Sequence, residues 1–539
     1  MTPSEPLLPT IPAHRSLAHL LADSAQRHPE HIALSWSDKS LRYGELQARV
    51  VALAAAWSAL GIGRGDRVAL LLPNTPTYVM AFYALMRLGA IAVNVSPGSQ
   101  GSELAHILRD SGAVAAVTLD VFLPGLYKAL PGSAVRHLFI TSLQGLEKRL
   151  PLPAGVPSPR PFEELLRPPP GPAAPAEISV GADELAVLQY TSGSTGAPKA
   201  VMLSHRGVLA SVAQSDAWMS EPQPPNAAVL CVIPFFHVFG LTIGLHLGIA
   251  KAYRLILIPR LDALDLVPLI RLIEAEKPVS FPSVPSLWAA LMSHPGVTAA
   301  VLQPVRVPSS GGAPLPAWVQ EKFRALTGRP IYEAYGLSEA SGATHCAPFP
   351  EGAPAGSIGR PLGAIQARLL DPCDPDGERE VAPGEVGELV VRGEPVMRGY
   401  FQDPELTASA LRGGWLRTGD LARRDADGFY YVVDRKDDLI ITSGYNLYPS
   451  EIEAVILRHP AVKDVAVVGV PDRLRGQVAR AHVVLKEGAG AAVSADELLV
   501  LCRDNLSPHK VPRSVVFTDS VPRNPAGKTV RKGLRDPAL

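Results

Sequence analysis

Apolar runs of strand length alternate with helix-like segments in the first part of the chain, and this alternation restricts the fold most. Residues 66–74 (DRVALLLPN) form a short apolar run that ends in proline and asparagine, and residues 77–88 follow with apolar side chains at helical spacing. Two more strand-like runs, 90–95 and 113–119, flank a helical stretch at 103–109. Such βαβ repeats predict parallel strands with helices on both faces, so the expected class is α/β.

The length of the chain, 539 residues, indicates more than one domain, because single cores rarely exceed about 300 residues. A turn followed by a strand that ends in charge suggests a boundary within residues 425–438. Strand-like runs at 464–470 and 480–485 lie beyond it. We therefore expect a large N-terminal domain of stacked sheets and helices, residues 1–434, and a small C-terminal α+β domain, residues 435–539.

Charge and cysteine content narrow the classes of protein to which the chain can belong. Lysine and arginine together number 51, as do aspartate and glutamate, so no global field favours nucleic acid or an anionic membrane surface. The four cysteines form no C-x-x-C pair, which argues against a disulfide framework or a structural zinc site. With no basic and apolar leader at the N-terminus, we expect a cytoplasmic protein that does not bind nucleic acid.

Two segments of unusual composition require an interpretation. Residues 227–250 are long and apolar enough to suggest a membrane span, but they contain Pro234, His237 and His246. We expect a strand, a loop and a buried helix there, and no transmembrane segment. Residues 151–177 are crowded with proline and alanine, which predicts an extended surface connection without a packed element.

A loop rich in glycine and hydroxyl side chains occurs at residues 190–205, with the sequence YTSGSTGAPKAVMLSH. Glycines let backbone N–H groups approach an oxyanion closely, the hydroxyls add donors, and Lys199 supplies a positive charge. Pro198 and Ala200 flank this lysine, whereas a Walker A loop has glycine before it and serine or threonine after it. The segment therefore predicts a phosphate-binding loop of another kind.

Five further short motifs follow this loop in the chain. They are SSGGAP at 309–314, YEAYGLSE at 332–339, WLRTGDL at 415–421, DRKDDLIITSGYNLYPSEIE at 434–453 and PRNPAGK at 522–528. The loop and these motifs, in this order, resemble the successive signatures of the adenylate-forming superfamily of acyl-CoA synthetases, luciferases and nonribosomal peptide adenylation domains. Each motif alone has a structural explanation as a turn, a core segment or a surface charge, but six ordered matches across the chain favour a shared function.

The resemblance implies that ATP is bound by residues of several motifs. These residues are Thr191, Ser192, Gly193, Ser194, Thr195, Lys199, Gly312, Ala313, Glu333, Ala334, Tyr335, Gly336, Ser338, Asp420 and Arg435. Within this set, the Tyr335 ring would offer a flat face to adenine. Asp420 would accept the ribose hydroxyl protons, and the planar guanidinium of Arg435 would hold the ribose and phosphate region.

The resemblance also implies a magnesium site and a catalytic lysine. Glu339 and the Thr195 hydroxyl are similar to the family's Mg²⁺ ligands, and a hard cation prefers such oxygen ligands. Lys528 matches the lysine that contacts the substrate carboxylate and the α-phosphate while negative charge develops. No nucleophilic side chain is needed, because the substrate carboxylate itself attacks the phosphorus.

A hinge and a coenzyme A site follow from the same resemblance. Asp437 stands at the position of the family's hinge, about which the small C-terminal domain rotates between two chemical steps. Ser443, Gly444 and Tyr445 would line the tunnel for the pantetheine arm of coenzyme A, with glycine allowing a close approach.

The expected acyl pocket contains His237, Phe239, Val284 and Gly311, and His237 would separate it from the thiol tunnel. None of the segments that contribute these residues carries an obvious charge for the ammonium group of an amino acid. We therefore expect an apolar acid, either a fatty acid or an aryl acid. Its chain length cannot be deduced, because one side chain can close such a pocket.

These residues predict an ATP-dependent acyl-CoA ligase that uses Mg²⁺, ATP, coenzyme A and a small carboxylic acid. The main alternative is an acyl-AMP ligase that loads an acyl carrier protein. A luciferase-like oxygenase shares the motifs, and a non-catalytic binding protein is disfavoured because Lys528, Glu339, Asp420 and Arg435 occur together. The oligomeric state stays open, with a homodimer among the expectations.

Overall fold

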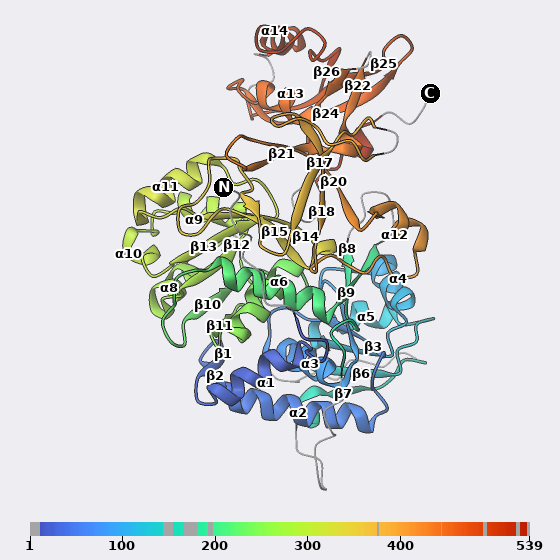
Figure 1. Cartoon of the computed structure of the whole chain (residues 1–539), viewed down its shortest axis with the longest axis vertical. Helices are drawn as coiled ribbons and strands as arrows, with labels where there is room; N and C mark the ends of the chain where they lie inside the picture. The colour runs from blue at the N-terminus through green and yellow to red at the C-terminus, as the bar shows by residue number, and fades with distance from the viewer. Residues whose placement is uncertain are drawn as a thin grey trace. The chain divides into compact units, whose positions relative to one another are not determined.

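A computed structural model of the chain describes most of its residues (Figure 1). The described ranges are 11–143, 155–166, 180–191, 198–262, 264–374, 377–442, 445–488, 493–523 and 529–535. The chain divides into two compact units. The first unit comprises residues 1–366 and 391–416, and the second unit comprises residues 367–390 and 417–539.

Within the described residues, the first unit contains a seven-stranded sheet in the order β7-β6-β5-β3-β4-β8-β9. Its strands are β3 (Arg67–Leu71), β4 (Ile91–Asn94), β5 (Ala115–Leu119), β6 (His137–Thr141), β7 (Pro159–Pro161), β8 (Leu185–Thr191) and β9 (Lys199–Ser204). All neighbouring pairs are parallel except β8 with β9. The predicted parallel βαβ arrangement is thus confirmed.

A second sheet of the first unit has nine strands in the described residues, in the order β16-β15-β14-β13-β12-β10-β11-β1-β2. Its strands are β1 (Ile32–Trp36), β2 (Lys39–Arg42), β10 (Ala228–Cys231), β11 (Arg254–Leu257), β12 (Ser280–Ser283), β13 (Val307–Gly311), β14 (Tyr332–Leu337), β15 (Gly342–Cys346) and β16 (Arg360–Pro361). The central pairs are parallel, and β2, β15 and β16 are antiparallel at the edges.

Helices flank both sheets of the first unit (Figure 1). They are α1 (Ala18–Arg27), α2 (Tyr43–Ala59), α3 (Pro76–Leu88), α4 (Gly101–Ser111), α5 (Leu123–Ala129), α6 (His205–Trp218), α7 (Gly248–Ala250), α8 (Val267–Glu276), α9 (Pro285–Ser293), α10 (Ala299–Leu302), α11 (Ala317–Thr327) and α12 (Pro404–Ala410), with the short helices η1 (Asp120–Phe122), η2 (Phe162–Leu166), η3 (Gly240–Leu247) and η4 (Ser338–Ala340). Apolar side chains of α8 to α11 pack on the nine-stranded sheet, and those of α4 and α5 pack on the seven-stranded sheet.

Helix α3 shows why these segments fold as they do. The Thr75 side chain caps its start by accepting the N–H of Tyr78 at 3.2 Å, and Gly89 ends it in the left-handed conformation. The helix is apolar on all sides and almost entirely buried. Its Tyr78 hydroxyl lies 2.7 Å from Oδ1 of Asn94, the last residue of β4, and 3.0 Å from the carbonyl oxygen of Phe235. Helix α3 thus joins the end of β4 in one sheet to the loop that follows β10 in the other.

The second unit contains β21 and most of β17, β18 and β20, together with a separate sheet. The elements of this part of the chain are β17 (Gln366–Leu370), β18 (Val386–Arg392), β19 (Leu411–Arg412), β20 (Trp415–Arg424), β21 (Tyr430–Arg435), η5 (Lys436–Asp438), β22 (Ile440–Thr442), β23 (Tyr445–Leu447), α13 (Pro449–Ile456), β24 (Val462–Asp472), β25 (Gly476–Leu485), α14 (Ala495–Asn505), β26 (Ser514–Phe517) and η6 (Arg531–Leu534). The separate sheet has the order β23-β22-β25-β24, with β26 paired to β25. Its core packs against α13 and α14, which confirms the predicted α+β character.

The apolar segment 227–250 folds as β10, a loop and the buried π-helix η3, as the polar residues within it predict. His246 of η3 is fully buried, and its Nδ1 lies 3.0 Å from the Tyr83 hydroxyl of α3. Burial lowers the pKa of His246 to about 3. None of the helices in the described ranges combines the length and the apolarity needed to cross a bilayer.

The expectation that residues 151–177 contain no packed element is wrong in part. Residues 151–154 and 167–177 lie outside the described residues, but Pro159–Pro161 forms β7 on the edge of the seven-stranded sheet. Phe162 is fully buried, with its ring 6.5 Å from that of Trp57. Proline is tolerated in an edge strand because one side of such a strand forms no ladder hydrogen bonds.

Candidate active site

The predicted phosphate loop connects two paired strands of the first unit. Thr191 ends β8 and Lys199 begins β9, and the two residues are antiparallel partners. The Nε2 atom of His106, from α4, lies 3.1 Å from the carbonyl oxygen of Pro198, next to Lys199. The strands thus fix both ends of the loop. The loop residues Ser192, Gly193, Ser194 and Thr195 lie outside the described residues, so their phosphate-binding role stays a prediction.

A segment distant in sequence extends the sheet beside Lys199. Residues 398–401 run antiparallel to β9, where the Met202 N–H donates to the Gly399 carbonyl oxygen at 2.9 Å and the Phe401 N–H donates to that of Ala200 at 2.8 Å. This pairing brings Tyr400 opposite Val201. The half-buried Tyr400 hydroxyl donates to Oε1 of Glu339 at 2.9 Å.

Glu339, the predicted metal ligand, is held through both its backbone and its side chain. It lies in η4, and its carbonyl oxygen accepts the N–H of Met397 at 2.7 Å. The Ser341 hydroxyl donates to the Pro395 carbonyl oxygen at 2.7 Å and ties the same turn to the same segment. The Tyr400 hydroxyl then fixes the carboxylate. Tyr400 belongs to none of the six motifs, and the only sequence signal for it is a polar aromatic residue after Gly399.

The donor set fits a magnesium ion that arrives with a nucleotide. Among the described residues there is no group of three or more His, Cys, Asp or Glu side chains that could hold a metal ion. Mg²⁺ commonly takes one or two protein carboxylates and completes its shell with phosphate oxygens and water. A single half-buried carboxylate, Glu339, near the strand that carries Lys199 meets that requirement.

The predicted adenine-binding residues lie at the end of β13 and in the first half of β14, which pair in parallel. Ser310 pairs with Glu333 and Gly311 pairs with Ala334. After β13 the chain turns at Gly312, whose φ of 88° suits glycine, and Ala313 is exposed. Residues 311–313 carry no side chain larger than a methyl group.

Tyr335 and Gly336 continue β14 into a bulge against β15. A Cβ atom at Gly336 would lie 2.1 Å from the carbonyl oxygen of Gly342, so only glycine fits there. The half-buried Tyr335 ring meets the buried His345 ring edge-on, with 5.9 Å between centroids. The bulge and this contact fix the orientation of the Tyr335 ring. Ser338 follows at the start of η4.

Glu333 has a strongly perturbed carboxyl group. Its Oε2 accepts the N–H of Leu315 at 3.2 Å, and the residue is mostly buried. Burial raises the pKa of Glu333 to about 7, and the hydrogen bond from Leu315 opposes this shift only in part. The carboxyl group therefore changes its charge close to neutral pH, beside the predicted adenine pocket.

Three of the four predicted acyl-pocket residues lie near the carboxyl ends of β12 and β13 in the nine-stranded sheet. A Cβ atom at Gly311 would lie 3.5 Å from the Phe239 ring, so these two residues are neighbours. Val284 follows β12 directly, and because Ser283 pairs with Ser310, Val284 leaves the sheet beside Gly311. His237 is exposed and accepts the Phe239 N–H at Nδ1, at 3.3 Å. It is therefore not a buried core histidine.

Asp420 and Arg435, the predicted ribose-binding pair, meet within the second unit. They are antiparallel partners on β20 and β21, and the Arg435 Nε lies 3.0 Å from the Asp420 Oδ1. The Asp420 side chain is 14% exposed and that of Arg435 is 49% exposed. Thr418 braces the turn, because its hydroxyl accepts the Asp420 N–H at 3.0 Å and donates to the Leu389 carbonyl oxygen at 2.7 Å.

The remaining predicted residues are placed less completely. Asp437 is exposed in η5, and Tyr445 begins β23, paired with Thr442. The coenzyme A residues Ser443 and Gly444 and the catalytic Lys528 lie outside the described residues. Their roles stay predictions.

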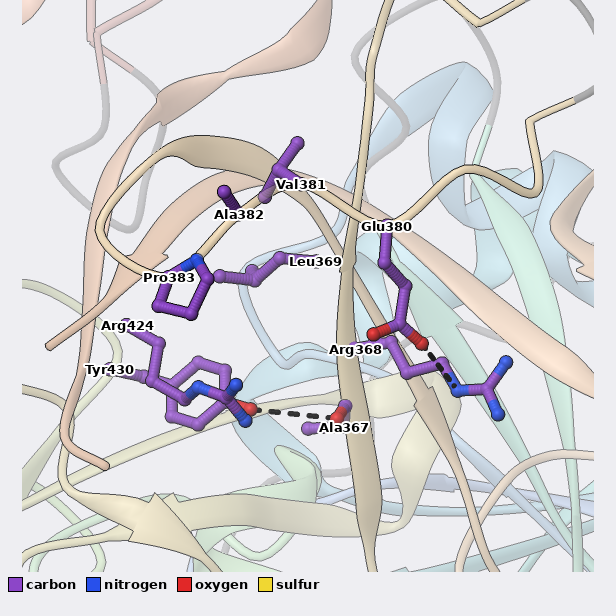
Figure 2. Close-up of a pocket in the computed structure, with 9 residues that line it drawn as sticks. All are labelled: Ala367, Arg368, Leu369, Glu380, Val381, Ala382, Pro383, Arg424 and Tyr430. Carbon is purple, nitrogen blue, oxygen red and sulfur yellow. Dashed lines mark hydrogen bonds and ion pairs between the residues drawn. The ribbon is translucent and has the colours of Figure 1, made fainter. Parts of the chain in front are cut away.

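A hollow elsewhere in the second unit is unrelated to these residues (Figure 2). It has a volume of about 30 Å³, and its lining includes the Arg368–Glu380 ion pair and Tyr430. The Tyr430 hydroxyl points to the Ala367 carbonyl oxygen across the hollow. Such a volume holds about one water molecule, so this hollow cannot bind an acyl chain.

Comparison with known proteins identifies the family. Residues 21–401 match the family described as AMP-binding enzyme, and residues 451–528 match the AMP-binding enzyme C-terminal domain. The chain belongs to the AMP-binding enzyme family. The superfamily resemblance seen in the six motifs is thereby confirmed.

Similarity to individual members of this family extends along the whole chain. The long-chain-fatty-acid–CoA ligase of Bacillus subtilis (strain 168) is 36% identical over 538 residues, which cover 97% of this chain and 94% of that protein. The ATP-bound crystal structure of MatB from Rhodopseudomonas palustris is 27% identical, with a TM-score of 0.82 and coverage of 96% of this chain and 98% of that chain.

A third relative has been solved with reaction components bound. The o-succinylbenzoate CoA synthetase MenE of Bacillus subtilis is 29% identical, and the match covers 96% of this chain and 98% of that chain. Its complex with the acyl-adenylate intermediate gives a TM-score of 0.77, and its complex with ATP and a magnesium ion gives 0.78. These structures confirm the predicted fold class of this AMP-binding enzyme.

Proposed function

We propose that this chain is an AMP-forming acid–thiol ligase that uses ATP to join a fatty acid to coenzyme A. The observation that carries most weight is the similarity to a long-chain-fatty-acid–CoA ligase over 97% of this chain. The paired Asp420 and Arg435, 3.0 Å apart, and the Glu339 carboxylate held by Tyr400 support it, because they are the groups that a nucleotide and its magnesium ion need.

In the first step a carboxylate oxygen of the acid attacks the α-phosphorus of ATP. The bond from that phosphorus to the bridging oxygen breaks, and pyrophosphate leaves with the bonding electrons. Lys199 and the loop after Thr191 would bind phosphate oxygens, and Glu339 with Thr195 would hold Mg²⁺, which neutralises charge on the phosphates when bound. Lys528 would stabilise the charge that develops between the carboxylate and the α-phosphate.

In the second step the sulfur of coenzyme A, having lost its proton, attacks the acyl carbonyl carbon. AMP leaves with the electrons of the broken carbon–oxygen bond, and a thioester forms. Ser443, Gly444 and Tyr445 would line the path of the thiol. The boundary between residues 434 and 435 and the hinge at Asp437 are part of this proposal, since the two steps need different groups near the acyl carbon.

The proposed acid is a long-chain fatty acid. Phe239 and Val284 offer apolar surface, and Gly311 lets the Phe239 ring lie close to β13. The named substrate of the Bacillus subtilis relative supports this choice. An aryl acid is the second candidate, because a structural relative of similar coverage is an o-succinylbenzoate CoA synthetase.

Coenzyme A is the proposed acceptor, and an acyl carrier protein is the alternative. We further propose that the protein works in the cytoplasm, in line with its balanced charge and its unpaired cysteines. A homodimer remains a proposal that analytical ultracentrifugation of the full chain would test.

The deciding experiment measures pyrophosphate release with ATP, Mg²⁺ and a panel of fatty and aryl acids, with and without coenzyme A, and identifies products by mass. We expect a fatty acid to give AMP and its CoA thioester, and Lys528→Ala to lose pyrophosphate release. Lys486→Ala is the matched control, since Lys486 is exposed and its ammonium, among the described residues, bonds the Pro460 carbonyl oxygen. Pyrophosphate without a CoA thioester would favour a carrier protein, and no release with any acid would contradict the proposal.

A further inference from the structure

The loop between β10 and η3 carries His237 and Phe239, two of the predicted acyl-pocket residues. We refer to residues 232–239 as the acyl loop. The His237 N–H donates to the Pro234 carbonyl oxygen at 3.0 Å. A Cβ atom at Gly240 would lie 2.3 Å from the same oxygen, so only glycine lets η3 begin this close to the loop. The acyl loop is therefore a compact turn whose shape depends on its backbone.

Asn74, which lies after β3, binds the first half of the acyl loop. Its Nδ2 donates to the carbonyl oxygens of Cys231 and Ile233 at 2.8 and 2.9 Å. Its Oδ1 accepts the Phe235 N–H at 2.7 Å. Because carbonyl oxygens only accept and an N–H only donates, these three bonds also fix which way the amide points.

A chain of three side chains binds the second half of the loop. Gln189 of β8 donates from Nε2 to the Phe236 carbonyl oxygen at 2.7 Å. Its Oε1 accepts from Nδ2 of Asn94, at the end of β4, at 3.0 Å. The Oδ1 of Asn94 accepts the Tyr78 hydroxyl of α3 at 2.7 Å, and this hydroxyl also lies 3.0 Å from the Phe235 carbonyl oxygen. The chain thus runs from α3 through two strands to the acyl loop.

Gln189 binds the acyl loop at the point where its predicted pocket residues begin. Phe236, whose carbonyl oxygen it bonds, directly precedes the exposed His237. Two residues after His237, the ring of Phe239 lies beside Gly311 of β13. The register of the sheet fixes Gln189 in turn, since its parallel partner on β4 is also its hydrogen-bond partner.

Burial makes the orientation of this network specific. Asn74, Tyr78, Asn94 and Gln189 are between 0% and 4% exposed. Burial also raises the pKa of Tyr78 well above its usual value, so the hydroxyl keeps its proton and stays a donor. A buried carbonyl oxygen that loses its donor carries the full cost of desolvation, so a satisfied network of this kind strongly favours one arrangement of the loop.

We propose that Gln189 is a positioning residue for the acyl chain of the substrate, because its bond to Phe236 holds the backbone that carries His237 and Phe239. The inference rests on the proposed function, in which these two residues line the acyl pocket. Loss of Gln189 should therefore weaken the binding of acyl ligands and leave the KM for ATP nearly unchanged. A glutamine that only stabilised the fold would lower the thermal midpoint without separating the acyl ligands from ATP.

The test measures the two half-reactions and the binding of palmitate in the full-length protein. Adenylation is followed as pyrophosphate release from ATP and palmitate, thioester formation is followed from synthetic palmitoyl-AMP and coenzyme A, and calorimetry gives the Kd of palmitate. Gln189→Met keeps the length of the side chain but cannot donate to Phe236. Because loss of a bond to a buried carbonyl group corresponds to a factor of about ten, we expect the Kd of palmitate and the KM for palmitate and palmitoyl-AMP to rise about tenfold. The KM for ATP should change by no more than about twofold, since the bond that is lost belongs to the acyl loop.

Two further variants keep the test decisive. Tyr78→Phe keeps the ring and removes the hydroxyl at the end of the chain, so it should raise the same constants about threefold, even if Gln189→Met fails to fold. Gln320→Met is the matched control, because the Gln320 side chain bonds the N–H and the carbonyl oxygen of Ile331, at 2.6 and 2.8 Å, outside the acyl loop. It should leave the KM for both acyl ligands unchanged.

Two results in a folded Gln189→Met protein would overturn the inference. One is an unchanged Kd and KM for palmitate, and the other is an equal rise in the KM for ATP. A wild-type protein that binds palmitate but releases no pyrophosphate would instead overturn the proposed function, and the Kd values alone would then decide the inference.

Discussion

Glu339 is a carboxylate prepared for a cation that comes with the substrate. Its backbone is fixed by Met397 and its Oε1 by the Tyr400 hydroxyl, 2.9 Å away, yet it has no companion carboxylate in a metal cluster among the described residues. A lone carboxylate binds Mg²⁺ weakly until phosphate oxygens complete the shell. Its orientation therefore matters more than its affinity, and that orientation depends on Tyr400.

Replacing Tyr400 by phenylalanine tests this dependence. Tyr400→Phe keeps the ring but removes the hydrogen bond, and bonds to charged groups contribute about 1.5 to 3 kcal/mol. We expect the Mg²⁺ concentration for half-maximal pyrophosphate release to rise about tenfold or more, since about 1.4 kcal/mol corresponds to a factor of ten. Tyr431→Phe is a matched control that removes a 2.9 Å bond to the Asp425 carboxylate, away from the predicted site. An unchanged magnesium dependence in Tyr400→Phe would contradict the role.

Glu333 predicts a dependence of stability on pH. Its pKa is raised from 4.5 to about 7 in the folded chain, so its stabilising contribution is complete below pH 4.5 and is lost as pH rises through 7. Glu333→Gln mimics the neutral form at every pH. We expect its stability relative to wild type to increase from pH 5 to pH 8 by about 1 to 2 kcal/mol, with allowance for partial solvent screening. Thermal unfolding at the two pH values measures this, and an equal difference at both would refute the shifted pKa.

The residues of the candidate site differ in how far sequence could predict them. Asp420 and Arg435 were each expected to contact the ribose, and the structure places them 3.0 Å apart because two neighbouring strands fix their register. Their contact with each other was not predicted. Tyr400 was not expected, because its contact with Glu339 requires residues 398–401 to pair with β9 from a distant part of the sequence. Periodicity and short motifs carry no information on such pairing.

Among the elements, those buried on all sides were predicted best. β3, α3 and β4 fall within a few residues of the expected runs, because continuous apolar sequence bounded by Thr75 and Gly89 leaves few alternatives. β7 was missed, because the proline-rich composition of its surroundings conceals a three-residue edge strand. Phe162, which directly follows this strand, is buried against Trp57. Such a contact between residues distant in sequence cannot be deduced from local composition.

The bulge between β14 and β15 also gives a testable prediction about these strands. A methyl group in Gly336→Ala would lie 2.1 Å from the Gly342 carbonyl oxygen, so the strands must separate. Overpacking of this kind costs about 1 to 3 kcal/mol or more. We expect a lower thermal midpoint and a raised KM for ATP, because Tyr335 moves with the bulge. Gly63→Ala, with nothing within 4 Å of the new methyl group, should match wild type. An unchanged KM for ATP in Gly336→Ala would show that the bulge does not affect nucleotide binding.

For the whole molecule, the compact units are not continuous in sequence. The chain leaves the first unit after residue 366, returns at 391 and leaves again after 416. A prediction based on a turn and a change of charge proposes one late boundary, here 434/435, whereas the last change between the compact units falls after residue 416. Such a prediction cannot detect the earlier excursion through β17 and β18. The two compact units are defined by contacts within one structure, and such contacts do not report movement. Rotation at Asp437 therefore stays a prediction.

Substitution of Asp437 tests the hinge directly. Proline fixes φ near −65° and also restricts the preceding residue, so Asp437→Pro should block one of the two backbone conformations that a rotating domain needs. We expect one half-reaction to fall about tenfold or more while the other persists, since the two steps use different arrangements of catalytic groups. Asp437→Ala removes the exposed side chain without restricting the backbone and should preserve both. If a folded Asp437→Pro protein keeps both half-reactions, the backbone at this residue does not need to change between the two steps. The C-terminal domain would then have to rotate about another residue.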